Sequence, residues 1–112
     1  MVAIHYLPEF LKQAKYLARK YASFPEDLKT CIQEITDNPF AGADLGGGVR
    51  KVRMAIKSKG KGKSGGARVI TFNYTLDEGS RDITLMTVYD KSERSTISDQ
   101  EITALRLKVE EE

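Results

Sequence analysis

Cysteine and histidine are almost absent from this chain of 112 residues, which has only Cys31 and His5. A single cysteine excludes an internal disulfide, and without a leader-like segment it favours a reducing cytoplasm. A single histidine excludes a histidine pair for acid–base catalysis, and the two residues together cannot build a usual zinc site. Cys31 falls on an apolar helical stripe and is expected in the core, and His5 is expected to be a packed or surface residue. No apolar run reaches the length of a membrane span.

Acidic residues are missing from one long stretch, between Asp44 and Asp77. The whole chain carries +2, but this stretch alone holds eight basic side chains, so the remainder carries −6 from 10 basic and 16 acidic residues. Such a concentrated positive field favours a polyanion as partner. The eight are Arg50, Lys51, Arg53, Lys57, Lys59, Lys61, Lys63 and Arg68.

The length predicts one domain, residues 1–112. Alternation predicts a strand over residues 2–7, and helical spacing predicts a helix from Pro8 through residue 21. A second helix follows, with Ser23 and Glu26 as a capping box. Asn38-Pro39 ends it.

Three strand-like runs follow a glycine-rich loop at residues 39–48. In the first, Val52, Met54 and Ile56 are expected to face the core, and Lys51, Arg53 and Lys57 a cationic surface. The other two strands cover residues 67–76 and 83–89, joined by a turn at residues 77–79. A second capping box, Ser98 with Glu101, begins a last helix that carries Ile102, Leu105 and Val109.

The expected order is therefore β-α-α-β-β-β-α, which indicates an α+β fold. Two helices between the first strand and the later meander imply that both pack on one sheet face. The other face, with the basic side chains, is expected to stay partly open.

The basic segment at residues 57–67 first suggests a phosphate loop. A Walker motif requires glycine five positions before Gly62, where Lys57 stands, and no helix follows. The plain alternative is a flexible linker. A polyanion site is favoured, because the basic bias continues into the flanking strand at Lys51 and Arg53.

Arg68 begins its strand, so it is either an edge arginine reaching solvent or a phosphate clamp with a rigid donor fork. Residues 89–93, YDKSE, are by composition a polar loop.

Three segments together resemble the RelE/HigB-type toxins of bacterial toxin–antitoxin modules, and in particular the HigB-like branch of these toxins. They are LGGGVRKVR at residues 45–53, SKGKGKSGGARVI at 58–70 and LMTVYDKSE at 85–93. The resemblance implies a RelE-like fold, a small twisted antiparallel sheet flanked by helices. It also implies an endoribonuclease that cuts translated mRNA at the ribosome without a metal or other cofactor. It also implies an antitoxin partner of helix-turn-helix type, which displaces the final helix or covers the basic face.

By motif position, Arg68 would hold the scissile phosphate and Lys91 would serve the leaving group. Lys61 and Lys63 are the candidate base and charge stabiliser, since crowding by other cations lowers the pKa of a lysine. The remaining residues are expected to bind RNA: Arg50, Lys51, Arg53, Lys57, Lys59 and, by stacking, Tyr89.

The chain departs from the family pattern after Lys91. Many relatives have an arginine next and a tyrosine in the final segment, where this chain has Ser92, Ile97 and Ser98. Two alternatives stay open: a ParE-like inhibitor of DNA gyrase with the same fold, and a nucleic-acid-binding module without activity.

Overall fold

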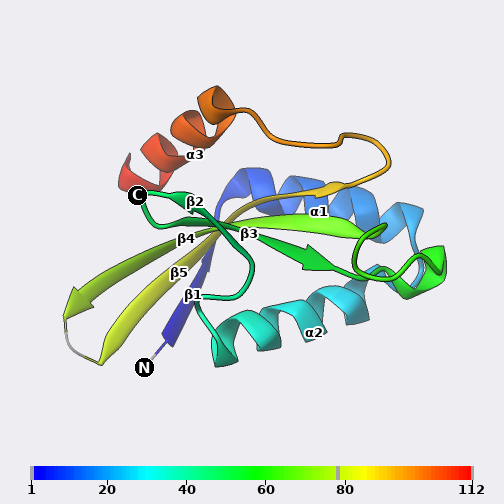
Figure 1. Cartoon of the computed structure of the whole chain (residues 1–112), viewed down its shortest axis with the longest axis horizontal. Coiled ribbons are helices and arrows are strands. Elements are labelled where there is room, and N and C mark those ends of the chain that lie inside the picture. Colours follow the sequence, from blue (N-terminus) through cyan, green and yellow to red (C-terminus); the bar gives the residue numbers. More distant parts are fainter. Residues whose placement is uncertain (1, 78, 112) are drawn as a thin grey trace.

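The computed structural model describes residues 2–77 and 79–111, and a five-stranded sheet forms its centre (Figure 1). The strands lie in the order β1-β5-β4-β3-β2. Their bounds are β1 Val2–Tyr6, β2 Ala43–Gly46, β3 Val49–Met54, β4 Ala67–Asp77 and β5 Ser80–Asp90. The α+β class expected from the sequence is confirmed, and the sheet is open at its edges.

One face of the sheet is covered by α1 (Pro8–Lys20) and α2 (Phe24–Asp37), as expected. Pro8 stands in the first turn of α1, where its missing N–H costs nothing. The helices bury apolar stripes against alternate strand residues, and Cys31 belongs to this core as predicted. The core includes Phe10, Leu17, Phe24, Ile35, Val52, Met54, Ile56 and Val69.

The opposite face carries a second apolar cluster beneath α3 (Asp99–Glu111). Leu105 is the buried residue of α3. Ser98 caps α3 as predicted, because its Oγ accepts the Glu101 N–H at 3.1 Å. In the second half of the box, the Glu101 carboxylate accepts the Ser98 hydroxyl at 3.2 Å in place of the Ser98 N–H. The cluster is Leu7, Val49, Ile70, Phe72, Met86, Tyr89, Ile97 and Leu105.

The capping box predicted at the start of α2 is wrong. Ser23 has helical backbone angles and makes no side-chain cap. Its hydroxyl instead donates to Asp27 and accepts the Ser58 N–H. The Ser23 side chain therefore joins the start of α2 to Ser58, in the segment between β3 and β4, instead of capping the helix.

Two features of the sheet differ from the predicted order. The loop expected at residues 39–48 contains the short edge strand β2, whose residues are all exposed and therefore show no apolar alternation. β1 pairs with β5 in parallel, Val2 opposite Arg81, so the sheet is mixed instead of purely antiparallel. Of the predicted turn at residues 77–79, Glu78 lies outside the described residues.

No helix among the described residues is both long enough and apolar enough to cross a membrane.

Candidate nucleic-acid interface

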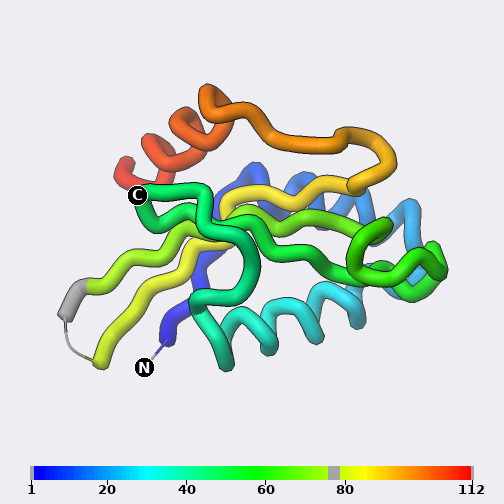
Figure 2. Tube along the Cα trace, viewed as in Figure 1, coloured from blue at the N-terminus to red at the C-terminus, as the bar shows by residue number. Residues whose placement is uncertain are grey.

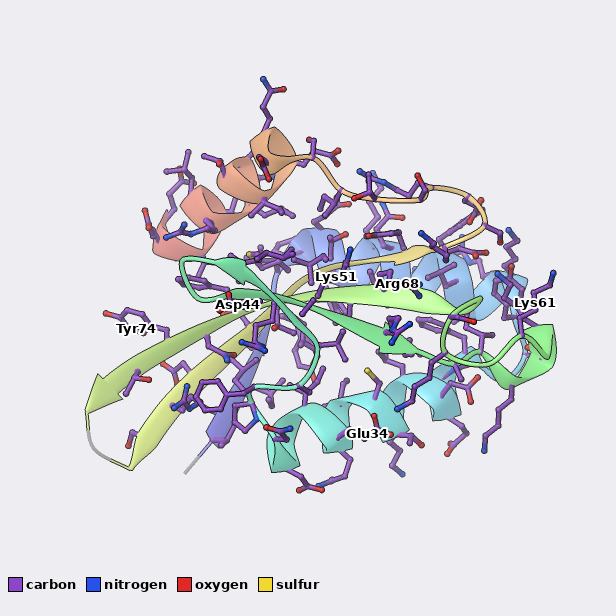
Figure 3. The ribbon with its side chains drawn as sticks, in the orientation of Figure 1. Glu34, Asp44, Lys51, Lys61, Arg68 and Tyr74 are labelled. Carbon is purple, nitrogen blue, oxygen red and sulfur yellow. The ribbon has the colours of Figure 1, made fainter. Side chains whose placement is uncertain are left out.

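Beside α3, the same face of the sheet carries a row of side chains that we call the basic row. Arg53 on β3, Arg68 on β4 and Tyr89 on β5 are direct cross-strand partners. Val52 and Met54 face α1 and α2, so alternation turns Lys51 and Arg53 to the α3 side, as predicted. Figure 3 shows Lys51 and Arg68 over the middle of the sheet, between α3 and the basic loop.

Arg68 is the most buried of these cations, at 6% exposure. Its guanidinium donates to the carbonyls of Lys63 at 3.1 Å, Ser64 at 3.0 Å and Ala67 at 3.1 Å. Burial lowers its pKa, and neighbouring Arg53 lowers it further, although an arginine stays charged in proteins. No acidic group of residues 2–77 and 79–111 forms an ion pair with it. The three carbonyls use three of its five N–H donors, which leaves two that could bind an anion.

The basic loop at residues 57–66 is held in place at both ends and is not a free linker. At its start, the Asp27 carboxylate accepts the Lys57 N–H at 2.8 Å. At its end, the Gly66 carbonyl accepts the Lys91 N–H at 3.0 Å. Figure 2 shows the loop at the end of the sheet where β5 stops and the segment 91–98 turns back toward α3. The backbone of the loop is therefore tied to α2 and to the end of β5.

The lysines of this loop are not crowded together as the sequence suggested. Lys59 lies 2.7 Å from the buried Asp90 carboxylate, with its side chain 7% exposed. Lys63 lies 3.5 Å from Glu34 on α2. The environment predicted for these two side chains is wrong, because each lies beside a carboxylate from a distant part of the sequence. Lys61 is exposed and lies at the far end of the loop in Figure 3.

Two more predicted RNA-binding residues lie away from the open face. Arg50 donates to the carbonyls of Ala41 and Gly42, and its guanidinium lies 5.9 Å from the Phe40 ring. Lys57 and Lys63 line a small cavity with Asp27 and Glu34 beside α2. The eight charges of the sequence therefore divide between two sides of the molecule.

Tyr89 is only 6% exposed, and the Arg94 guanidinium lies 5.2 Å from the centre of its ring. Its hydroxyl is buried and makes no hydrogen bond within the described part of the chain, and burial raises its pKa. The stacking role predicted for Tyr89 thus lacks an exposed ring. Arg94 also binds Glu101 at 2.6 Å and the Thr96 carbonyl, so it links the segment after β5 to α3.

Lys91, the other predicted catalytic residue, follows β5 directly. Its ammonium donates to the Ser95 carbonyl at 2.8 Å. The main-chain bond from Lys91 to Gly66 places it beside the last residues before Arg68. The structure thus brings together Lys51, Arg53, Arg68 and the start of the segment at Lys91, and leaves Lys57 and Lys63 on the α2 side.

Sequence reasoning missed two residues of this region. The composition of residues 89–93 placed Asp90 in a polar loop, although a carboxylate at the end of a buried strand needs hydrogen-bond or ionic partners. Arg94 belongs to no motif of the sequence, and only its place over Tyr89 shows its role. His5, on β1, lies 3.4 Å from Asp82 and is 54% exposed, consistent with a surface histidine. Among the described residues, no three His, Cys, Asp or Glu side chains form a group that could bind a metal ion.

Residues 10–110 match the family model described as the RelE toxin of the RelE / RelB toxin-antitoxin system.

Proposed function

The chain belongs to the RelE toxin family of toxin–antitoxin systems, and from this membership we propose that it is an endoribonuclease that cleaves translated mRNA at the ribosome. The observation that carries the proposal is Arg68, a buried guanidinium with no carboxylate partner in the described chain, beside Arg53 on the open face. A phosphodiester placed there would receive two cationic donors, which match phosphate geometry.

The proposed reaction is attack of a ribose 2′-oxygen on the adjacent phosphorus. The new 2′-O–P bond gives a 2′,3′-cyclic phosphate, and the P–O5′ bond breaks. A base takes the 2′ proton, an acid gives a proton to the 5′-oxygen, and cations stabilise the charge of the phosphorane. Arg68 and Arg53 would supply that stabilisation.

The proton-transfer roles are assigned from position. Lys91 follows β5 and lies next to the loop end, so we assign it to the leaving oxygen. For the base we retain Lys61 and add Lys51, which shares the open face with Arg68. We assign no chemistry to Lys63, because its ammonium lies with Glu34 on the α2 side.

A cognate antitoxin follows from the family. We propose that it is of helix-turn-helix type and either displaces α3 or covers the basic face. Leu105 is the one buried residue of α3, and Ile102 and Val109 are partly buried. A groove of about 550 Å³ also runs beside α3, lined by Phe72, Tyr74 and Val109 among others. These features support displacement, and the free charge of Lys51 and Arg53 supports cover by an acidic segment.

The test is a cell-free translation reaction programmed with a reporter mRNA, with cleavage sites mapped by primer extension. We expect fragments with 5′-hydroxyl ends, which polynucleotide kinase labels without prior phosphatase treatment. Arg68→Lys keeps the charge and loses the donor fork, so the cleavage rate should fall about 100-fold. Arg19→Lys, on the exposed side of α1, is the matched control and should cut like the wild type. An intact reporter at high concentrations of wild-type protein would refute the nuclease proposal.

A further inference from the structure

Asp90 joins three parts of the fold at the end of β5. Its side chain is fully buried, with 0% exposure. One carboxylate oxygen accepts from Lys59 Nζ at 2.7 Å, and from the Ser92 hydroxyl and N–H at 2.7 and 3.0 Å. The other oxygen accepts from the Tyr21 hydroxyl at 2.5 Å, with Lys20 Nζ 3.4 Å away. The basic loop, the segment after β5 and the end of α1 therefore meet at one carboxylate.

The bond to Lys59 fixes the first turn of the basic loop, Lys57–Lys59. Lys59 Nζ also donates to the Ser92 hydroxyl at 2.7 Å and lies 5.6 Å from the centre of the Tyr21 ring. A charged pair away from water is strongly unfavourable to separate, because either partner alone would be a buried, uncompensated charge. The loop backbone at Lys59 is consequently anchored to the end of β5.

This anchor acts on the residues around Arg68. The same loop presents the carbonyls of Lys63 and Ser64, which hold the Arg68 guanidinium. Its last residue, Gly66, accepts the N–H of Lys91. A loop released at Lys59 would move the carbonyls that orient Arg68 and change its place relative to Lys91.

We propose that Asp90 is a positioning residue of the RNA-cleavage site, which fixes the basic loop through Lys59 and so orients Arg68 toward the scissile phosphate. The inference rests on the proposed nuclease function. Asp90 itself touches no RNA, because its carboxylate is buried and its oxygens are already occupied. The rival explanation is a contribution to stability alone.

The experiment compares Asp90→Asn, Lys59→Met and the double variant, with Lys29→Met on the exposed side of α2 as control. Cleavage of mRNA in programmed ribosomes is measured well below each variant's unfolding temperature. A displaced phosphate clamp should lower kcat about 10- to 100-fold in both single variants. KM should change little, because Lys51 and Arg53 lie on the sheet and remain in place. The double variant should lose no more than either single variant, because all three break one link.

Two further measurements separate positioning from stability. Trypsin should cut after Lys61 or Lys63 in the folded single variants at least about tenfold faster than in the wild type, since the released loop opens locally. Lys59→Arg preserves the ion pair and should restore kcat, and it also serves if Asp90→Asn does not fold. Unchanged kcat and unchanged tryptic cleavage in folded variants would overturn the positioning role. A wild-type protein that cuts no message would refute the proposed function instead, while the tryptic measurement would still report on the anchor.

Discussion

Arg53 and Arg68 are direct cross-strand partners on β3 and β4, so two like charges face each other across an antiparallel pair. Such pairs are unfavourable by about 0.2–1 kcal/mol. Their cost is removed when an anion lies between them, so the pair favours the bound state of the protein over the free one.

Replacing one partner should therefore separate stability from RNA binding. We expect Arg53→Gln to raise the free energy of unfolding by up to about 1 kcal/mol and to weaken RNA binding. Urea unfolding and fluorescence anisotropy with a short RNA measure the two quantities. Arg19→Gln should change neither, and a loss of stability in Arg53→Gln would contradict this account of the pair.

The division of the charges between two sides predicts different salt dependences. Lys51 lies on the open face, so Lys51→Gln should reduce the slope of log K against log salt by about 1. Lys63 lies with Glu34 on the α2 side, so Lys63→Gln should leave the slope as it is. RNA binding titrated from low to moderate salt gives both slopes. Equal reductions would show that RNA also passes over the α2 side.

The hydrogen bonds of Asp90 should make the stability of the fold sensitive to acid. Burial alone would raise its pKa, but hydrogen bonds from Lys59, Tyr21 and Ser92 outweigh that effect and hold the pKa well below its usual range. The folded pKa is depressed, so the stabilisation is present above the unfolded value of about 4 and is lost as the pH falls below it. The free energy of unfolding of the wild type, measured in urea from pH 6 to pH 3, should therefore decline more steeply than that of Asp90→Asn. Parallel curves would mean that Asp90 does not titrate in this way.

Gly66 allows the loop to return closely against β3. A Cβ atom there would lie 2.0 Å from the Met54 carbonyl oxygen, which is main chain and cannot move aside. Gly66→Ala should therefore destabilise the fold by about 3 kcal/mol. Gly60 has a positive φ of 72° and open space, so Gly60→Ala should cost only about 1 kcal/mol. Chemical unfolding of both variants tests the difference, and equal costs would show that the loop can shift.

Two leucines of α3 test how this helix is held. Leu105 is 8% exposed and Leu107 is 54% exposed, although they are two positions apart. Leu105→Ala should lower the free energy of unfolding by about 2–3 kcal/mol, because it removes buried apolar contacts between α3 and the sheet. Leu107→Ala should stay within about 0.5 kcal/mol of the wild type. Thermal unfolding of both variants measures this difference. Similar losses of stability in the two variants would mean that α3 packs on the sheet through another face.

Periodicity predicted the helices and long strands because their apolar residues recur on buried faces. The alternation of Val52 and Met54 with Lys51 and Arg53 gave the correct two faces of β3. β2 was not predicted, because it pairs with β3 through the backbone and all of its side chains are exposed. The parallel pairing of β1 depends on where the chain returns, which alternation alone does not encode.

The candidate site was only partly predictable for a related reason. Charge clustering located the basic surface, but the direction of each side chain depended on acids far away in the sequence. The Asp90 carboxylate forms an ion pair with Lys59, and the Glu34 carboxylate lies beside the Lys63 ammonium. A local pattern of lysines therefore indicated a crowded cationic loop, whereas the folded chain separates its members.

The parallel pairing of β1 with β5 also determines when the sheet can form during synthesis of the chain. Val2–Tyr6 leave the ribosome well before their partners Arg81–Leu85, which follow much later in the sequence. Non-local strand pairing of this kind slows folding, and the sheet cannot close on an incomplete nascent chain. Tyr89, Asp90 and Lys91 emerge later still, so the basic row and its anchor can form only after the chain has been made as far as Lys91. A nascent chain that stops short of Lys91 therefore cannot assemble the basic row or its anchor.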